Sequence, residues 1–464
     1  MFRNTRHVHL VAIGGIGMSG IAEILLNLGF QVSGSDLHAG EATERLERLG
    51  ARIHIGHAPE QIQGADVVVR SSAVTPANPE VQAARRQGIP VIRRAEMLAE
   101  LMRLKYGIAV AGSHGKTTTT SLCAAVLAAG GLDPTVVVGG RALATGANAI
   151  LGRGEYMVAE ADESDGTFTS LVPTVAVVTN LDLEHVDFYP DLPALRDAFR
   201  RFLARVPFYG ACVLCADDPE VRALASSLDR KVITYGLSTD ADVRGEPLDA
   251  VGRRARVFMH DREVGELSLG IAGLHNLTNA LGAVAVGMEL GVPFGPAADA
   301  LAAFSGVGRR YEDHGVHGGV RVVDDYGHHP TEVAAVLALA RAEAGDGNVR
   351  VLFQPHRYSR TQRFAEEFAD VLTGADAVAL LPVYAAGETA PAGVGSGLIA
   401  DGLARRGAEL VTLLDGPHDV PGWIEAAVSS GDLLLTLGAG DVGRLAPRLA
   451  RLLDGEPDAW PAKA

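Results

Sequence analysis

The amino-acid sequence predicts an α/β protein of three domains with largely parallel sheets. Apolar strands alternate with helices and short loops along most of the chain, which is the pattern of such sheets. Two glycine-rich turns, at residues 14–20 and 112–115, each follow a strand and open a helix. A chain of 464 residues also exceeds what one hydrophobic core normally holds. We expect domains at 1–104, 105–308 and 309–464.

Composition and charge exclude several classes. The 47% hydrophobic and 21% charged content is typical of a soluble globular protein, and a net charge of −15 disfavours broad nucleic-acid binding. Three cysteines cannot build a disulfide framework. Cys212 and Cys215 lie three apart in an apolar strand, without the second pair that a zinc site needs. We recognise no signal peptide and no membrane-length apolar segment, so we expect a cytoplasmic protein without membrane partners.

The first glycine turn lies in HVHLVAIGGIGMSG and satisfies the pattern G-x-G-x-x-G. Its glycines are Gly15, Gly17 and Gly20. The next strand ends at Asp36, near the place where a dinucleotide fold carries its ribose-binding acid. A nicotinamide dehydrogenase is one interpretation. The pattern itself indicates only a helix N-terminus that accepts a diphosphate, and any nucleoside diphosphate carries one.

Polar residues follow a later strand of the same domain, where the ligands of open sheets gather. They are Ser71, Ser72 and Asn78. Helix capping and turn formation would explain these residue types equally well. The sequence leaves both interpretations open.

The second glycine turn, GSHGKTT at residues 112–118, predicts a nucleoside-triphosphate site. Glycine lets the backbone approach the anion, Lys116 can meet the terminal phosphates, and the hydroxyl of Thr117 can bind Mg²⁺. The usual pattern G-x-x-x-x-G-K-[ST] is not fully met, because Val110 stands where its first glycine belongs. The strand before the turn and the helix after it still favour a phosphate loop over an ordinary turn.

Acidic and polar side chains follow two further apolar strands of the central region. The first group is Glu160, Asp162, Glu163 and Asp165; the second is Asn180, Asp182, Glu184, His185 and Asp187. Such residues often form only a solvated loop. Beside a phosphate loop, two sets of hard oxygen ligands favour Mg²⁺, which proteins hold with one or two carboxylates plus phosphates.

The C-terminal third again alternates strands and helices, and polar groups again follow its strands. Arg357 and Arg360 could clamp a carboxylate or a phosphate with paired N–H donors. His275 and Asn276 open a helix before this region, where such a pair is more often a cap than a ligand. The predicted order is a dinucleotide-binding-like domain, a P-loop-type ATPase sheet, and a doubly wound dinucleotide-binding-like domain.

Ten motifs, spread over almost the whole chain and in the same order, resemble those of the Mur ligases, the ATP-dependent amide ligases of bacterial cell-wall synthesis. They are GGIGMSG at Gly14, GSHGKTT at Gly112, EADESD at Glu160, TNLDLEH at Thr179, LHNLTNA at Leu274, GVGRRYE at Gly306, DDYGHHPTE at Asp324, FQPHRYSRT at Phe353, YAAGE at Tyr384 and GAGD at Gly438. The seventh and eighth motifs favour the alanine-adding member. Sister ligases carry a carbamylated lysine where this chain has Phe199 and no lysine.

The resemblance implies a reaction. ATP, with Mg²⁺, would activate the carboxylate of UDP-N-acetylmuramate as an acyl phosphate, and L-alanine would displace phosphate to give an amide. The three domains would bind the UDP substrate, ATP and the amino acid in that order, in a monomer or weak homodimer. Two alternatives remain: a related ligase that joins a whole murein tripeptide to the same substrate, and a non-catalytic ATP-binding switch.

The resemblance also implies roles for individual residues. ATP would be bound by Gly112, Ser113, His114, Gly115, Lys116, Thr117, Thr118, His275, Asn276 and Arg310. The UDP substrate would contact Gly15, Ile16, Gly17, Ser19, Asp36, Ser71, Ser72 and Asn78. Mg²⁺ would be held by Thr117, Glu160 and His185, and the amino acid by Tyr326, His328 and Arg357. The residues expected to be catalytic are Lys116, Glu160, His185, His328, Arg357 and Arg360.

Overall fold

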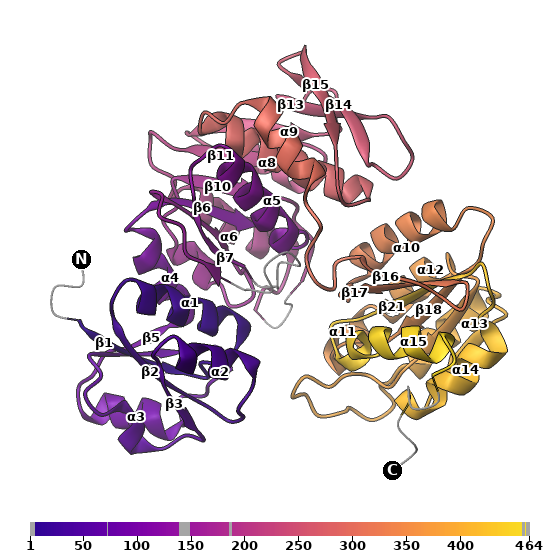
Figure 1. Ribbon diagram of the computed structural model, residues 1–464, viewed down its shortest axis with the longest axis horizontal. Coiled ribbons are helices and arrows are strands. Elements are labelled where there is room, and N and C mark those ends of the chain that lie inside the picture. Colours follow the sequence, from indigo (N-terminus) through magenta and orange to yellow (C-terminus); the bar gives the residue numbers. More distant parts are fainter. Residues whose placement is uncertain (1–4, 72, 139–148, 185–187, 457–459, 461–464) are drawn as a thin grey trace. The chain divides into compact units, whose positions relative to one another are not determined.

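The computed structural model describes residues 5–71, 73–138, 149–184, 188–456 and 460. The chain divides into two compact units (Figure 1). One unit comprises Met1–Ile271 and His275–Ser305, and the other comprises Ala272–Leu274 and Gly306–Ala464. The first unit contains two of the sheets and the second contains the third. The domain boundaries predicted above stay predictions.

The N-terminal sheet has five strands in the order β3-β2-β1-β4-β5, and all its pairs are parallel. Its elements are β1 (His7–Val11), α1 (Ile16–Asn27), β2 (Gln31–Asp36), α2 (Glu41–Arg48), β3 (Arg52–Ile55), η1 (Pro59–Ile62), β4 (Val67–Arg70), α3 (Pro79–Arg86), β5 (Val91–Arg93) and α4 (Arg94–Met102). Because the strand order reverses between β1 and β4, the loops that follow these two strands flank the crevice where open sheets bind ligands.

The central sheet has ten described strands in the order β15-β14-β13-β12-β11-β10-β6-β9-β7-β8. Its strands are β6 (Tyr106–Ala111), β7 (Thr135–Val137), β8 (Ala149–Ile150), β9 (Tyr156–Glu160), β10 (Val175–Val178), β11 (Ala211–Cys215), β12 (Lys231–Gly236), β13 (Val243–Pro247), β14 (Arg254–Met259) and β15 (Arg262–Ser268). Its helices are α5 (Lys116–Ala129), η2 (Thr167–Ser170), α6 (Leu192–Leu203), α7 (Pro219–Ala225), α8 (Leu274–Glu289) and α9 (Phe294–Ala302). The pairs from β7 through β13 are parallel, and β14 and β15 form an antiparallel hairpin.

Cores on the two faces of the central sheet explain its long apolar strands. Strand β11 is buried throughout, and its two cysteines belong to different hydrophobic clusters: Cys212 packs with Leu214 and Phe202, and Cys215 with Val213 and Tyr235. Both thiols are free. The two cysteines lie in the apolar strand expected from the sequence, and each packs in the core on its own face of the sheet.

The C-terminal sheet has six described strands in the order β16-β17-β21-β18-β19-β20, parallel except for the β16–β17 pair. Its strands are β16 (Glu312–His317), β17 (Val320–Asp325), β18 (Val349–Phe353), β19 (Ala377–Leu380), β20 (Val411–Leu413) and β21 (Leu433–Leu437). Its helices are α10 (Pro330–Ala344), α11 (Tyr358–Arg363), α12 (Ala365–Leu372), α13 (Gly397–Arg405), η3 (Pro417–Asp419), α14 (Val420–Ala427), η4 (Asp441–Arg444) and α15 (Ala446–Leu453).

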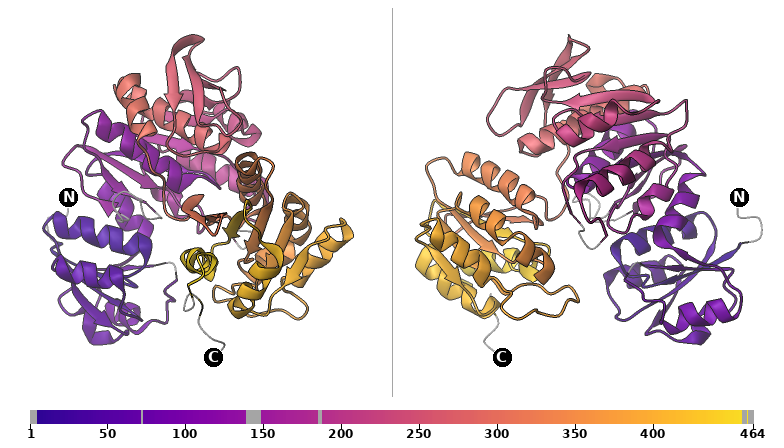
Figure 2. Two further views of the ribbon diagram at one scale, coloured as in Figure 1. Left: turned by 45° about the vertical axis from the view of Figure 1, so that its right-hand side comes forward. Right: turned by 180° about the vertical axis from the view of Figure 1, so that it is seen from behind.

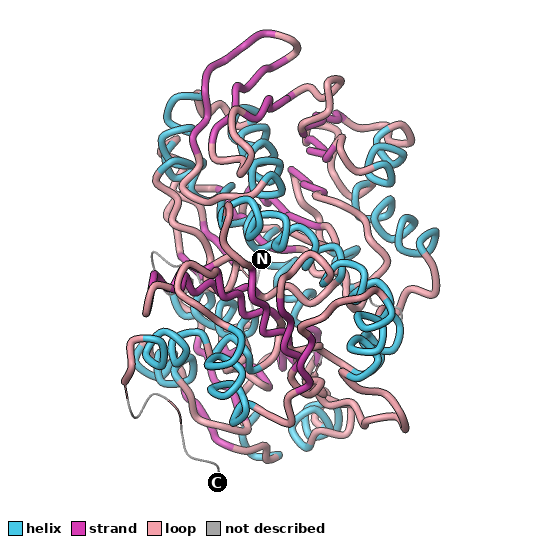
Figure 3. The backbone as a smooth tube through the Cα atoms, turned by 90° about the vertical axis from the view of Figure 1, so that its right-hand side faces the viewer, coloured by secondary structure: helices cyan, strands magenta, loops and turns pink. Residues whose placement is uncertain are grey.

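Helices cover both faces of this sheet, as Figure 2 shows. Helices α10, α12 and α13 share one hydrophobic cluster with it, and α14 and α15 share another. Figure 3 distinguishes the helices, the strands and the loops between them by colour. Among the described residues, no helix combines the length and the apolar character that crossing a lipid bilayer requires.

Candidate active site

The first glycine turn joins β1 to α1 and is fixed by Asp36. Gly15 is the N-cap of α1 in an extended conformation and has no side chain with which to cap the helix. The Oδ2 atom of Asp36 accepts a hydrogen bond from the N–H of Gly14 at 2.8 Å. The carboxylate therefore positions the turn, and its contact with a bound substrate stays a prediction.

The remaining residues predicted to bind the UDP substrate have different surroundings. Asn78 is the N-cap of α3: its Oδ1 accepts from the N–H groups of Glu80 and Val81 at 2.9 and 3.3 Å. Capping, one of the two interpretations left open, is what the structure shows for Asn78. The N–H of Ser71 donates to the carbonyl of Val11 at 3.4 Å, and Ser19 is buried in α1. Ser72 and the side chain of Ile16 lie outside the described residues.

The second glycine turn joins β6 to α5 and has the geometry of a phosphate loop. Gly112 and Gly115 have φ values of 137° and 82°, a conformation that favours glycine. Gly115 is the N-cap of α5 without a capping side chain, which leaves the first N–H groups of the helix available to an anion. Thr117 and Thr118 follow in the first turn of the helix and are buried.

A second loop, which follows β10, holds the phosphate loop in place. Asn180 accepts from the N–H of His114 at 2.8 Å and donates to its carbonyl at 3.1 Å. Thr179 donates to the same carbonyl at 2.6 Å, and Ser113 donates to the carbonyl of Asp182 at 2.9 Å. Strand β10 pairs with β6, so its end lies beside the loop. Asn180, grouped above with metal ligands, instead holds the loop.

Lys116 lies folded over the phosphate loop and is paired with Glu163. Its Nζ donates to the carbonyls of Gly112 and Ser113 at 2.6 and 3.0 Å and lies 2.9 Å from Oε2 of Glu163. Burial opposes the charge of Lys116, but the charges of Glu163, Asp162 and Glu184 outweigh it and raise the pKa of Lys116. The ammonium group thus stays charged. Glu163, predicted from the sequence as a metal ligand, is a partner of the lysine.

The end of β9 offers a ligand suited to a metal ion. Glu160 closes this strand, which pairs with β6, and its Oε1 is buried without a hydrogen-bond partner among the described residues. A carboxylate oxygen of this kind, with the hydroxyl of Thr117 at the start of α5, fits the oxygen preference of Mg²⁺. His185, the third predicted ligand, lies outside the described residues.

Helix α8 brings another polar residue to the phosphate loop. A Cβ at Gly115 would lie 3.0 Å from Oδ1 of Asn279, so this side chain contacts the turn. His275 and Asn276 lie at the start of the same helix, as predicted. Asn279 was not predicted from the sequence, although its position one helical turn after Asn276 was a signal for it.

In the second unit, aromatic and imidazole rings form a row. Neighbouring ring centroids lie 5.4 Å apart for Tyr326 and His328, 5.8 Å for His328 and His356, and 5.6 Å for His356 and Tyr384. The guanidinium of Arg310 lies 5.0 Å from the ring centroid of Tyr326. Of the row, only Tyr326 and His328 were predicted as site residues.

His356 is held as a neutral imidazole beside two arginines. Burial, followed by the charges of His328, Arg360 and Arg357, lowers the pKa of His356 to about 3. Nη1 of Arg360 lies 3.1 Å from Nδ1 of His356, and because a guanidinium can only donate, Nδ1 accepts. Arg357 has a φ of 67°, a strained conformation for a residue other than glycine and a common feature of functional sites.

These features define a class. One unit carries two separate glycine turns that each open a helix. Among the described residues, only the second turn is accompanied by a lysine and by a buried carboxylate oxygen without a hydrogen-bond partner. The other unit carries arginines next to rings that can surround a small ligand. The protein is therefore an enzyme of nucleotide-dependent chemistry.

Comparison with known proteins identifies the family. Three family models match: the Mur ligase family catalytic domain at residues 7–106, the Mur ligase middle domain at 110–287 and the Mur ligase glutamate ligase domain at 309–440. The UDP-N-acetylmuramate–L-alanine ligase of Desulfosudis oleivorans is 51% identical over 96% of this chain and 98% of its own. The chain belongs to the Mur ligase family.

Solved structures agree with this assignment. The UDP-N-acetylmuramate-alanine ligase of Thermotoga maritima is 29% identical, with a TM-score of 0.81 over 97% of this chain and 99% of its own. A murein peptide ligase of Psychrobacter arcticus is 25% identical, with a TM-score of 0.71 over 97% of this chain and 99% of its own. The predicted three-domain α/β architecture is confirmed, and membership of this family removes the dehydrogenase alternative.

Proposed function

We propose that this protein is an ATP-dependent ligase that joins L-alanine to the carboxylate of UDP-N-acetylmuramate in peptidoglycan precursor synthesis. The observation that carries the proposal is the presence of two phosphate-accepting turns in one unit, with a lysine on the second only. Two nucleotides can then be bound at once with different roles. The relatives at about 50% identity bear the name of this activity, which supports the choice of substrates.

The first chemical step activates the substrate carboxylate. One of its oxygens attacks the γ-phosphorus of ATP, the bond to the β,γ-bridging oxygen breaks, and an acyl phosphate and ADP form. Lys116 is charged and leaves its carbonyl partners to meet the phosphates, and the N–H groups at the start of α5 neutralise charge on the transferring group. Catalysis of this kind depends mainly on positioning and charge.

The second step forms the amide. The amine of L-alanine attacks the acyl carbon, the tetrahedral intermediate expels inorganic phosphate, and the amine loses a proton. We propose that Arg357 and Arg360 hold the amino-acid carboxylate or the phosphoryl group, since paired guanidinium donors match both anions. Tyr326 and His328 would limit the space for the amino-acid side chain, and the contact of their rings fits that role.

Glu160 and Thr117 are the described residues that we propose as Mg²⁺ ligands, together with His185. When bound there, Mg²⁺ would neutralise the negative charge of the ATP phosphates. The unpartnered Oε1 of Glu160 supports this assignment. We also propose that the enzyme acts in the cytoplasm, as a monomer or weak homodimer, with its buried cysteines reduced.

Release of phosphate from ATP tests the function. The reaction contains Mg²⁺ and UDP-N-acetylmuramate, with L-alanine, L-serine, glycine or the murein tripeptide L-alanyl-γ-D-glutamyl-meso-diaminopimelate added in turn. We expect release that requires both substrates and is strongest with L-alanine. Strong release with the tripeptide alone would assign the recycling reaction instead. Binding of ATP without release under any of these conditions would favour a non-catalytic switch.

A further inference from the structure

One side chain of the first unit, Arg94, contacts both the first glycine turn and the segment that follows β9. Arg94 is the first residue of α4, directly after β5, and its Nη2 lies 3.0 Å from Oδ2 of Asp162. A Cβ added at Gly17 would overlap Nη1 of Arg94 and lie 3.2 Å from its Cζ. The two ends of the guanidinium therefore face different sites: Nη1 lies on the first glycine turn, and Nη2 is bound to the segment that follows β9.

The segment that Arg94 contacts leads directly to the lysine of the phosphate loop. Asp162 accepts from the N–H of Ser164 at 3.1 Å, which fixes the turn that carries Glu163. Glu163 is the carboxylate paired with Lys116 at 2.9 Å. Stronger or weaker binding of Asp162 by Arg94 would therefore change the position of Glu163, one residue further on, and with it the position of Lys116.

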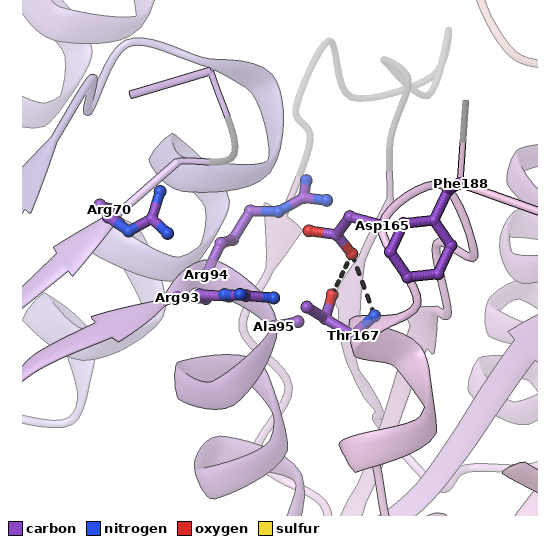
Figure 4. Close-up of a pocket in the computed structure, with 7 residues that line it drawn as sticks. All are labelled: Arg70, Arg93, Arg94, Ala95, Asp165, Thr167 and Phe188. Atoms are coloured by element: carbon purple, nitrogen blue, oxygen red, sulfur yellow. Dashed lines mark hydrogen bonds between the residues drawn. The ribbon is translucent and has the colours of Figure 1, made fainter. Parts of the chain in front are cut away.

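The ion pair between Arg94 and Asp162 is partly exposed to solvent, and Arg94 is accessible to a ligand. The two side chains are 33% and 43% exposed, so solvent competes with the ion pair and the pair contributes little stability by itself. Arg94 lines a cavity of about 260 Å³ together with Arg70, Arg93 and Thr167 (Figure 4). Figure 4 shows Arg94 extending from the start of α4 towards the loop that carries Asp165 and Thr167. A ligand that binds the guanidinium of Arg94 would reduce the conformational freedom of this partly exposed side chain.

We propose that Arg94 is a positioning residue that couples the two nucleotide sites. A diphosphate on the first glycine turn accepts from Nη1 while Nη2 stays on Asp162, so occupation of one site orders the segment that holds Lys116 for the other. Binding of the two nucleotides is then mutually favourable, because each ligand finds the guanidinium already ordered. The inference rests on the function proposed above.

Arginine is required for this role because its planar fork presents separate donors to two partners. A lysine at the same place keeps the charge but has one ammonium group, which cannot serve both ends in this geometry. The variant Arg94→Lys therefore tests whether the positive charge alone is enough or whether one side chain must contact both partners. Asp162→Asn keeps the shape of the other partner and removes its charge.

The test measures the dissociation constant of ADP, with Mg²⁺, in the absence and presence of saturating UDP-N-acetylmuramate by titration calorimetry. For the unaltered protein we expect ADP to bind on the order of tenfold more tightly when the second ligand is present. The ratio should fall close to one in Arg94→Lys and in Asp162→Asn, and the double variant should lose nothing more. The matched control, Arg93→Lys, lines the same cavity and should keep the ratio.

The outcomes separate the inference from the proposed function. The coupling role alone would be overturned if Arg94→Lys left the ratio of the two ADP dissociation constants unchanged. It would also be overturned if the reductions of this ratio in the two single variants were additive in the double variant. Failure of the unaltered protein to bind UDP-N-acetylmuramate would overturn the proposed function and the inference with it. A merely structural role would lower the thermal midpoint without changing the ratio. If Arg94→Lys does not fold, an unchanged ratio in Asp162→Asn still overturns the proposal.

Discussion

The two glycine turns of the first unit share one local design and differ in their neighbours. Each follows a parallel strand and opens a helix behind a glycine N-cap. The first is fixed by one carboxylate, Asp36, and has no cation of its own in the turn. The second is tied through His114 to the loop after β10 and contains Lys116 paired with Glu163. A glycine turn at a helix start is suited to bind phosphate in both places. We expect catalysis only at the second turn, because the neighbouring strand ends supply it with charged and metal-binding side chains.

Removing the lysine tests this difference most strongly. In Lys116→Ala we expect turnover to fall by about a thousandfold or more, because charge on the transferring phosphoryl group is no longer neutralised. Binding of UDP-N-acetylmuramate should remain nearly unchanged, since the other turn carries that ligand. Phosphate release and titration calorimetry measure the two effects separately.

A surface lysine provides the control for this prediction. Lys231 pairs with Glu289 at 2.6 Å and is more than half exposed, so Lys231→Ala should leave both measurements unaltered. Equal losses of turnover and of UDP-substrate binding in Lys116→Ala would show that the two turns do not serve different ligands.

Adding a methyl group to each turn is expected to have the next largest effect. In Gly112→Ala the new Cβ would overlap the side chain of Thr179 and lie 3.1 Å from its backbone nitrogen, so the loop must shift. In Gly17→Ala the new Cβ would meet only the flexible end of Arg94. We expect Gly112→Ala to lower the thermal midpoint and to abolish measurable ADP binding, and Gly17→Ala to change the midpoint much less.

Alanine at a position with positive φ destabilises the protein even without a steric clash, so the comparison of Gly112→Ala with Gly17→Ala needs a control for this backbone cost. Gly29 has a φ of 85° with no atom near a new Cβ, so Gly29→Ala reports the cost of the backbone conformation by itself. That cost is on the order of 1–2 kcal/mol. If Gly112→Ala is no more damaging than Gly29→Ala, close packing against Thr179 is not what shapes the phosphate loop.

Loss of the tie between the two loops should have a moderate effect. Asn180→Ala removes both hydrogen bonds to the backbone of His114 and leaves the partly buried N–H of His114 without this acceptor. The expected cost is about 1–3 kcal/mol in the stability of the loop, which should weaken ADP binding by roughly tenfold or more. Unaltered ADP affinity in titration calorimetry would contradict a role for Asn180 in holding the loop.

The elements around both turns could be predicted because local sequence determines local backbone. An apolar strand, a glycine turn and a helix-forming run are enough to place β6, the phosphate loop and α5, and the same holds for β1 and α1. The separation of Cys212 from Cys215 also follows from the two-residue period of a strand. These predictions needed no knowledge of distant contacts.

Partner choice could not be predicted in the same way. Glu160 closes β9 and three further acidic residues follow it. The sequence does not reveal that Glu163 pairs with Lys116, while Oε1 of Glu160 has no hydrogen-bond partner among the described residues. That choice depends on how the segment turns after Ala161, where Asp162 accepts a hydrogen bond from the N–H of Ser164. The stacking of His356 on Tyr384 could not be predicted for a related reason, because it brings together loops that follow two different strands.

The smallest expected effect concerns Asn78, for which the sequence left two roles open. Asn78→Ala removes the cap of α3 and should cost about 1 kcal/mol of stability. Asn78→Ser keeps a capping oxygen but lacks the amide N–H donors that a substrate contact would use. If Asn78 acts only as a cap, the alanine variant loses stability, the serine variant recovers most of it, and both bind UDP-N-acetylmuramate like the unaltered protein. Weaker binding of UDP-N-acetylmuramate in both variants, with stability restored in Asn78→Ser, would instead show that the amide of Asn78 contacts the substrate. The loop after β4 would then add a polar side chain to the substrate site at the first glycine turn.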